Sequence, residues 1–128
     1  MKFTFLKKRL YDDDSDPTNN DSHLHIVEKL SKATVAVVGI GGVGAWAAEA
    51  LCRSGIGNII LMDLDDICIS NTNRQLHAMS STIGKLKTEE TKKRLEDINP
   101  NVNVTLIHDF VSNAVELSSQ LNRSLHSK

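Results

Sequence analysis

A glycine cluster that directly follows a short β-branched run constrains this chain most, because residues 34–44 read TVAVVGIGGVG. Gly39 allows a sharp turn out of a strand, and Gly41 and Gly42 let backbone N–H groups approach a phosphate closely. Gly44 lets the following helix pack near the strand. The N-terminus of that helix adds unsatisfied N–H groups and a partial positive charge. The cluster therefore predicts a phosphate-binding cradle rather than a glycine-rich turn without a ligand.

The hydrophobic pattern predicts alternating helices and strands joined by short turns. This order is typical of one mononucleotide-binding half of an α/β fold, a Rossmann-like, doubly wound parallel sheet in three αβα layers. The chain then stops, so we expect a fold truncated after the third strand and its helix, with one sheet edge unpaired. The predicted helices cover residues 23–30, 42–53, 84–98 and 112–125, and the predicted strands cover 34–38, 58–64 and 102–107.

Composition predicts a single domain and argues against a membrane-spanning or secreted protein. The chain has 128 residues, of which 40% are apolar, and its net charge is −1. No apolar run is long enough to span a membrane, and the basic residues 1–10 are followed at once by aspartates, so we expect a cytoplasmic protein. Residues 11–22 are polar and acidic, so we expect residues 1–22 to form a flexible segment ahead of the domain at 23–128. Cys52 and Cys68 lack metal-site spacing, so we expect both to be small core residues.

Asp63 ends the second predicted strand, 19 residues beyond Gly44. In a dinucleotide fold such a carboxylate accepts hydrogen bonds from ribose hydroxyls, so an NAD site and an ATP site look alike to this point. The next loop reads SNTNRQ and contains Arg74, and Lys87 follows. Two cations at one edge suit a phosphate that gains charge during reaction, although ordinary surface charges on a solvated loop remain an alternative.

Several strings resemble the adenylyltransferase family that includes ThiF, MoeB and the ubiquitin-activating enzymes, namely GIGGVG, DLDD, SNTNRQ, GKLK and INP. The NTNRQ form is most similar to the branch of tRNA threonylcarbamoyladenosine dehydratases, and the similarity covers residues 23–111. The resemblance implies a homodimeric ATP-binding domain that uses ATP and Mg²⁺ to convert a carboxylate into an acyl-adenylate. It also implies a tRNA substrate and sulfur-transfer partners of the cysteine desulfurase system.

By the same resemblance, Arg74 and Lys87 are the catalytic residues, and they also bind the nucleotide. Asn71 falls at a ribose and phosphate contact, and Arg9 matches an arginine that reaches the partner's site. No residue is assigned to a metal, because the family's magnesium aspartate would lie beyond residue 111. The remaining nucleotide-binding residues are the four glycines and the ribose carboxylate: Gly39, Gly41, Gly42, Gly44 and Asp63.

Two other functions remain open from the sequence. One is a non-catalytic module that binds ATP or mediates dimerisation. The other is an NAD(P)-dependent oxidoreductase domain, against which Arg74, Lys87 and the NTNRQ loop argue, since an NAD site needs no further cations beside its glycine loop.

Overall fold

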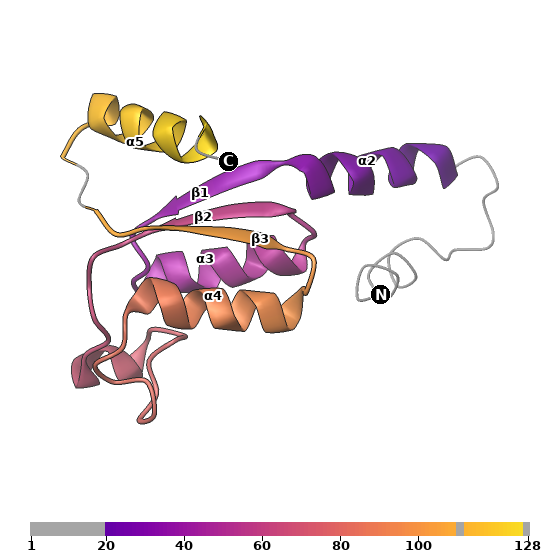
Figure 1. The fold of residues 1–128 in the computed structure, drawn as a ribbon. Helices are drawn as coiled ribbons and strands as arrows, with labels where there is room; N and C mark the ends of the chain where they lie inside the picture. The colour runs from indigo at the N-terminus through magenta and orange to yellow at the C-terminus, as the bar shows by residue number, and fades with distance from the viewer. Residues whose placement is uncertain (1–19, 110–111, 127–128) are drawn as a thin grey trace.

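The computed structural model describes residues 20–109 and 112–126, which form a small three-layer fold (Figure 1). Arg9 and nearly all of the predicted flexible segment 1–22 lie outside the described residues. The first described helix begins at Asn20 rather than at residue 23. The elements in chain order are α2 (Asn20–Lys32), β1 (Thr34–Val38), α3 (Gly42–Arg53), β2 (Asn58–Met62), the 3-10 helix η1 (Ile69–Asn73), α4 (Lys87–Ile98), β3 (Asn103–Ile107) and α5 (Ala114–His126).

The three strands form one parallel sheet in the order β1-β2-β3, which confirms the predicted Rossmann-like arrangement. In the register of the sheet, Val38 lies opposite Met62, and Met62 lies opposite Ile107. The carboxyl ends of all three strands therefore meet at one edge, where ligands bind in open α/β sheets. Among the described residues, the outer edges of β1 and β3 pair with no further strand.

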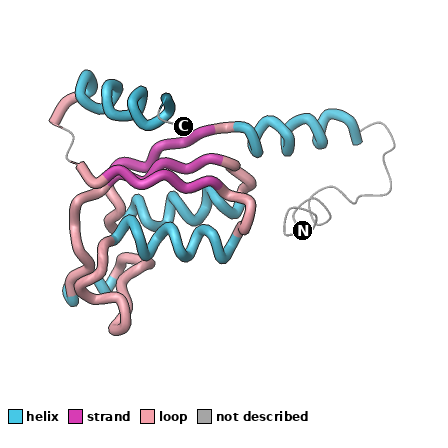
Figure 2. The backbone as a smooth tube through the Cα atoms, viewed as in Figure 1, coloured by secondary structure: helices cyan, strands magenta, loops and turns pink. Residues whose placement is uncertain are grey.

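Helices cover both faces of the sheet, as predicted. In Figures 1 and 2, α3 and α4 lie side by side under one face, and α5 lies over the other. The central strand β2 is buried on both faces, since Ile59 and Leu61 join the core against α3 and α4 while Ile60 and Met62 are buried on the opposite side. Its near-continuous apolar sequence is explained by this double burial.

Two of the glycines in the cradle are required by the backbone. Gly39 has φ = +86°, a conformation that other residues adopt only with strain. A Cβ atom on Gly44 would lie 1.8 Å from the carbonyl oxygen of Gly39, so only glycine lets α3 start this close to β1. Both predicted roles are confirmed. Gly57 makes a similar approach that the sequence analysis missed, because a Cβ there would lie 1.7 Å from the Ser31 oxygen.

Three local predictions were wrong. Helix α4 begins at Lys87 rather than at Gly84, because Gly84 has φ = +86° and belongs to a turn. Cys68 is exposed, whereas Cys52 is buried as expected and its Sγ–H donates to the Leu95 oxygen. Trp46 is 56% exposed, whereas a tryptophan on the helix after the glycines is expected to be a packing residue. In the part of the chain that the structure describes, no helix combines the length and apolarity needed to cross a bilayer.

Candidate nucleotide site

The glycine turn and Asp63 form the centre of the site. Helix α3 starts without a side-chain cap and carries no acidic residue in its first turn, so its N-terminal N–H groups are available to an anion. The Asp63 carboxylate accepts the Ile40 N–H at 2.7 Å through Oδ2 and the Asp65 N–H at 2.8 Å through Oδ1. These two bonds hold the carboxylate beside the glycine turn, with acceptor positions left for hydroxyl donors.

Arg74 lies over the start of α3. Its Cγ and Cδ atoms are each 3.5 Å from the position that a Cβ on Gly42 would take. The guanidinium Nη1 donates to Asn73 Oδ1 at 2.9 Å, while the indole N–H of Trp46 donates to the Arg74 carbonyl at 3.2 Å. Trp46 thus connects α3 to the loop that carries Arg74. The exposed Arg74 side chain lies next to the N-terminus of α3, where a phosphate would be favoured.

Asn71 helps to build the loop that carries Arg74. Its Oδ1 accepts the Cys68 N–H at 2.8 Å, and its backbone oxygen accepts the N–H groups of Arg74 and Gln75. The side-chain oxygen is therefore used inside the turn, and Nδ2 is the part of the amide that is left for a ligand.

Lys87 is held at the same edge by a short antiparallel clip that the sequence did not reveal. The clip joins residues 65–67 to residues 84–87 through the bonds Gly84 N to Ile67 O at 2.8 Å and Lys87 N to Asp65 O at 3.1 Å. The side chain of Lys87 is only 8% exposed, and its Nζ lies 3.6 Å from Asp65 Oδ2. A buried ammonium with one loose, largely exposed partner is suited to a second anionic partner.

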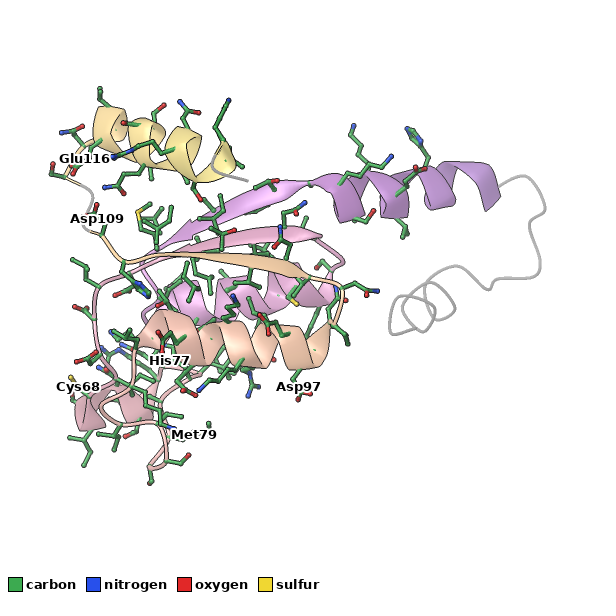
Figure 3. All side chains as sticks on the ribbon, in the orientation of Figure 1. Cys68, His77, Met79, Asp97, Asp109 and Glu116 are labelled. Atoms are coloured by element: carbon green, nitrogen blue, oxygen red, sulfur yellow. The ribbon has the colours of Figure 1, made fainter. Side chains whose placement is uncertain are left out.

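His77 lies next to the glycine turn, near the edge where the carboxyl ends of the strands meet (Figure 3). It is buried, and its Nε2 lies 2.7 Å from the Ile40 oxygen, which requires the Nε2–H tautomer. Its Nδ1 is buried and has no hydrogen-bond partner among the residues that the structure describes. Burial lowers the pKa of the imidazole below its usual value, the hydrogen bond to Ile40 opposes this, and Lys87 lowers the pKa further. A structural role for His77, which the absence of a nucleophile near it in the sequence favours, fits this geometry.

The lowered pKa of His77 predicts that acid weakens the fold. The unfolded chain takes up the proton near pH 6.5 and the folded chain only at lower pH, so stability is lost as the pH falls below about 6.5. We expect the urea midpoint to fall more between pH 7.5 and pH 5.5 in the natural chain than in His77→Gln, which keeps a neutral donor. An equal fall in both chains would show that His77 does not contribute.

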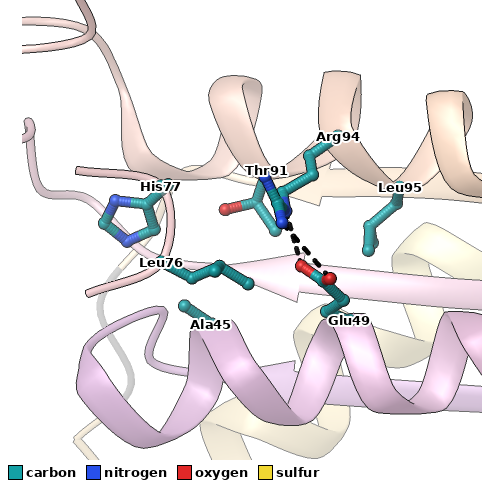
Figure 4. A pocket seen from close by; sticks show the side chains of 7 residues that line it. All are labelled: Ala45, Glu49, Leu76, His77, Thr91, Arg94 and Leu95. Carbon is teal, nitrogen blue, oxygen red and sulfur yellow. Dashed lines mark hydrogen bonds and ion pairs between the residues drawn. The ribbon is translucent and has the colours of Figure 1, made fainter. Parts of the chain in front are cut away.

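Glu49 and Arg94 join α3 to α4, and each lies two turns after the first residue of its helix (Figure 4). Glu49 is 8% exposed and accepts from Arg94 Nε through Oε2 and from Arg53 Nε at 3.0 Å through Oε1. The hydrogen bond from Arg94 lowers the pKa of the Glu49 carboxyl against the opposing effect of burial. The cleft beside this pair, which His77 also lines, has no interior volume for a water molecule. Of these contacts, only the pair Glu49 and Arg53 could be expected from the sequence, because residues four apart are neighbours on a helix.

The predicted residues converge on one edge of the sheet. The glycine turn contacts Asp63 and Arg74, Asp63 holds the backbone of Asp65, and Asp65 holds Lys87. Within residues 20–109 and 112–126, no group of three His, Cys, Asp or Glu side chains is arranged to hold a metal ion. The arrangement offers a helix N-terminus, two cations and a ribose-type carboxylate, which together fit a nucleoside phosphate.

Comparison with known proteins agrees with this geometry. The chain is 56% identical over 95 residues to the tRNA threonylcarbamoyladenosine dehydratase of Haemophilus influenzae, and 51% identical over 86 residues to that of Escherichia coli. It spans about a third of these curated relatives, 36% and 32% of their lengths. The crystal structure of the E. coli dehydratase TcdA in complex with ATP has 40% identity and a TM-score of 0.76, and the match covers 92% of this chain and 44% of that chain.

A family model agrees as well. The model described as the ThiF family matches residues 17–125, which include every predicted site residue except Arg9. The matched residues thus contain the Rossmann-like fold, the glycine turn, Arg74 and Lys87. The chain belongs to the ThiF family, whose members include ATP-dependent adenylyltransferases.

Proposed function

We propose that this chain binds ATP at the glycine turn and provides the nucleotide half of an enzyme that adenylates a carboxylate. The observation that carries the proposal is that Arg74 lies over the uncapped N-terminus of α3 while Asp63 and Asp65 link the buried Lys87 to the same glycine turn. Preorganised cations at this edge suit a phosphate that gains charge during a reaction. The ATP-bound structure of the E. coli relative supports the choice of nucleotide.

Each residue has a chemical role in the proposed reaction. Asp63 accepts from the ribose hydroxyls, and the Nδ2 group of Asn71 donates to ribose or phosphate. When the carboxylate attacks the α-phosphorus and pyrophosphate leaves, negative charge builds up on the phosphate oxygens. Arg74 and Lys87, already in position, stabilise that charge more than the charge of bound ATP, and this difference lowers the barrier.

Mg²⁺ is proposed only as the counter-ion of the ATP phosphates, because such ions are commonly held by substrate phosphates with one or two carboxylates. Asp65 is the exposed carboxylate closest to this role, since it lies at the same edge and already contacts Lys87. Mg²⁺ would there neutralise phosphate charge. We assign no geometry to the ion.

The proposed carboxylate is the threonylcarbamoyl group of threonylcarbamoyladenosine in tRNA, which would close into a ring after adenylation. Its support is the similarity to the tRNA threonylcarbamoyladenosine dehydratases of Haemophilus influenzae and E. coli, together with the NTNRQ string. A homodimer and sulfur-transfer partners stay predictions from the family resemblance, and a cytoplasmic location stays a prediction from the sequence. The alternative of a non-catalytic ATP-binding module differs from this proposal in one property, pyrophosphate exchange.

A chimera tests the proposed function. Residues 23–109 of this chain would replace the matching part of the E. coli dehydratase, and the product would be incubated with ATP, Mg²⁺ and tRNA that carries threonylcarbamoyladenosine. We expect ATP–pyrophosphate exchange and the cyclised nucleoside, detected by mass spectrometry. A folded chimera that binds ATP but exchanges no pyrophosphate would favour the non-catalytic module instead.

A further inference from the structure

Two consecutive loop residues, Arg74 and Gln75, lie against two consecutive glycines of the cradle. Arg74 lies over Gly42, and Nε2 of Gln75 is 3.9 Å from the position that a Cβ on Gly41 would take. The sequence analysis and the family resemblance assign roles to Asn71 and Arg74 but none to Gln75. Its side-chain amide nevertheless lies at the turn where the phosphates of a nucleotide would bind.

Gln75 is buried without being satisfied by the protein. The residue is 6% exposed, yet its Oε1 has no hydrogen-bond partner within the described structure. Buried side-chain amides are normally paired, because a lost hydrogen bond to water is otherwise not replaced. Nε2, the end of the amide that lies near Gly41, is likewise without a hydrogen-bond partner among the described residues, so this amide needs an explanation.

The backbone, not the amide, fixes the position of Gln75. Its N–H donates to the Asn71 oxygen at 2.9 Å, and its oxygen accepts the Ala78 N–H at 3.0 Å. These bonds belong to the loop that also positions Arg74 and His77. The loop backbone thus holds Gln75 over Gly41 without a hydrogen bond from the side-chain amide to the described residues.

We propose that the Gln75 amide is a nucleotide contact, with Nε2–H donating to a phosphate oxygen bound at the Gly41–Gly42 turn. This role rests on the proposed ATP site. A neutral donor suits this position, because a cation in place of the buried Gln75 amide would be costly to desolvate. The amide also provides direction, since its N–H groups lie in a plane fixed by the loop.

The test compares ATP with adenosine, which lacks the phosphates. In Gln75→Met, which keeps the side-chain length, we expect ATP to bind about fivefold more weakly or worse, from the loss of one hydrogen bond to a charged group. The affinity for adenosine and the thermal midpoint of the ligand-free protein should not fall. Trp46, the sole tryptophan, is bonded to the Arg74 carbonyl and provides the fluorescence signal.

Gln120→Met is the matched control. Gln120 is also 6% exposed, and its buried Oε1 has no partner in the described part of the chain, but it lies on α5 and its Nε2 donates to Asp109. We expect this variant to bind ATP like the natural chain. A second variant, Gln75→Glu, replaces the donor by an anion and should weaken ATP more than Gln75→Met does. If Gln75→Met does not fold, the ATP affinity of Gln75→Glu decides whether Gln75 contacts the phosphates.

The outcomes separate the two proposals. If the natural chain binds ATP and Gln75→Met binds it equally well, or loses ATP and adenosine to the same extent, the Gln75 contact is wrong and the ATP site stands. If the natural chain binds no ATP, the proposed function fails and the role of Gln75 fails with it. A loss confined to ATP supports both.

Discussion

Replacing Lys87 by methionine should lower ATP–pyrophosphate exchange of the chimera on the order of a hundredfold or more, as does the loss of other preorganised donors. Methionine keeps the buried stem of the side chain, so the loss is of charge and not of packing. The Nζ group is almost fully buried and its partner Asp65 is 67% exposed, so removing it leaves no buried carboxylate behind. Arg74→Ala should behave similarly, because Arg74 lies over the N-terminus of α3.

Lys93→Met is the control for this pair. Lys93 lies on the exposed side of α4, where it pairs with Glu90 away from the glycine turn. We expect its substitution to leave the exchange rate unchanged. Exchange at the rate of the parent chimera in Lys87→Met or in Arg74→Ala would remove the catalytic role from that residue.

Replacing Arg94 by methionine should lower the free energy of unfolding by about 2 kcal/mol, less than a fully buried pair would lose because Arg94 is 40% exposed. The loss arises because Glu49, which is buried, keeps only Arg53 as a partner. Since Glu49 and Arg94 join the two helices that carry the glycine turn and Lys87, the variant also tests how the site is held together. Urea denaturation measures the change.

Lys32→Met provides the comparison for the ion pair, since Lys32 and Glu28 are 74% and 62% exposed and such pairs contribute little. The urea midpoint of Lys32→Met should not differ measurably from that of the natural chain. The double variant Glu49→Leu/Arg94→Leu should recover most of the lost stability, because apolar replacement of a whole buried pair is close to neutral. If Arg94→Met is as harmless as Lys32→Met, the pair does not hold α3 to α4.

The periodic elements and the glycine turn could be predicted from the sequence because their causes are local. The apolar run of β2 and the small residues of α3 determine their own structures, and the steric need for Gly39 and Gly44 is a property of one turn. Asp63 could be placed because it ends a strand, and parallel strands end at a common edge.

The loop that carries Arg74 could not be predicted in the same way, because long-range contacts shape it. It reads as polar, yet Gln75 and His77 are buried, and His77 bonds to Ile40 across 37 positions. Likewise, the clip that holds Lys87 pairs two segments of irregular chain, which have no periodic signal. The pairing of Glu49 with Arg94 depends on how two helices pack, and spacing along one helix does not reveal it.

Calorimetric titration of ATP and NAD into the purified chain tests the central claim most directly. If Arg74 and Lys87 make this glycine turn an ATP site, ATP should bind saturably at one site and NAD far more weakly. Asp63→Ala, which removes the ribose acceptor at the same edge, should weaken ATP binding. Tighter binding of NAD than of ATP, or ATP binding that is insensitive to Asp63, would contradict the assignment.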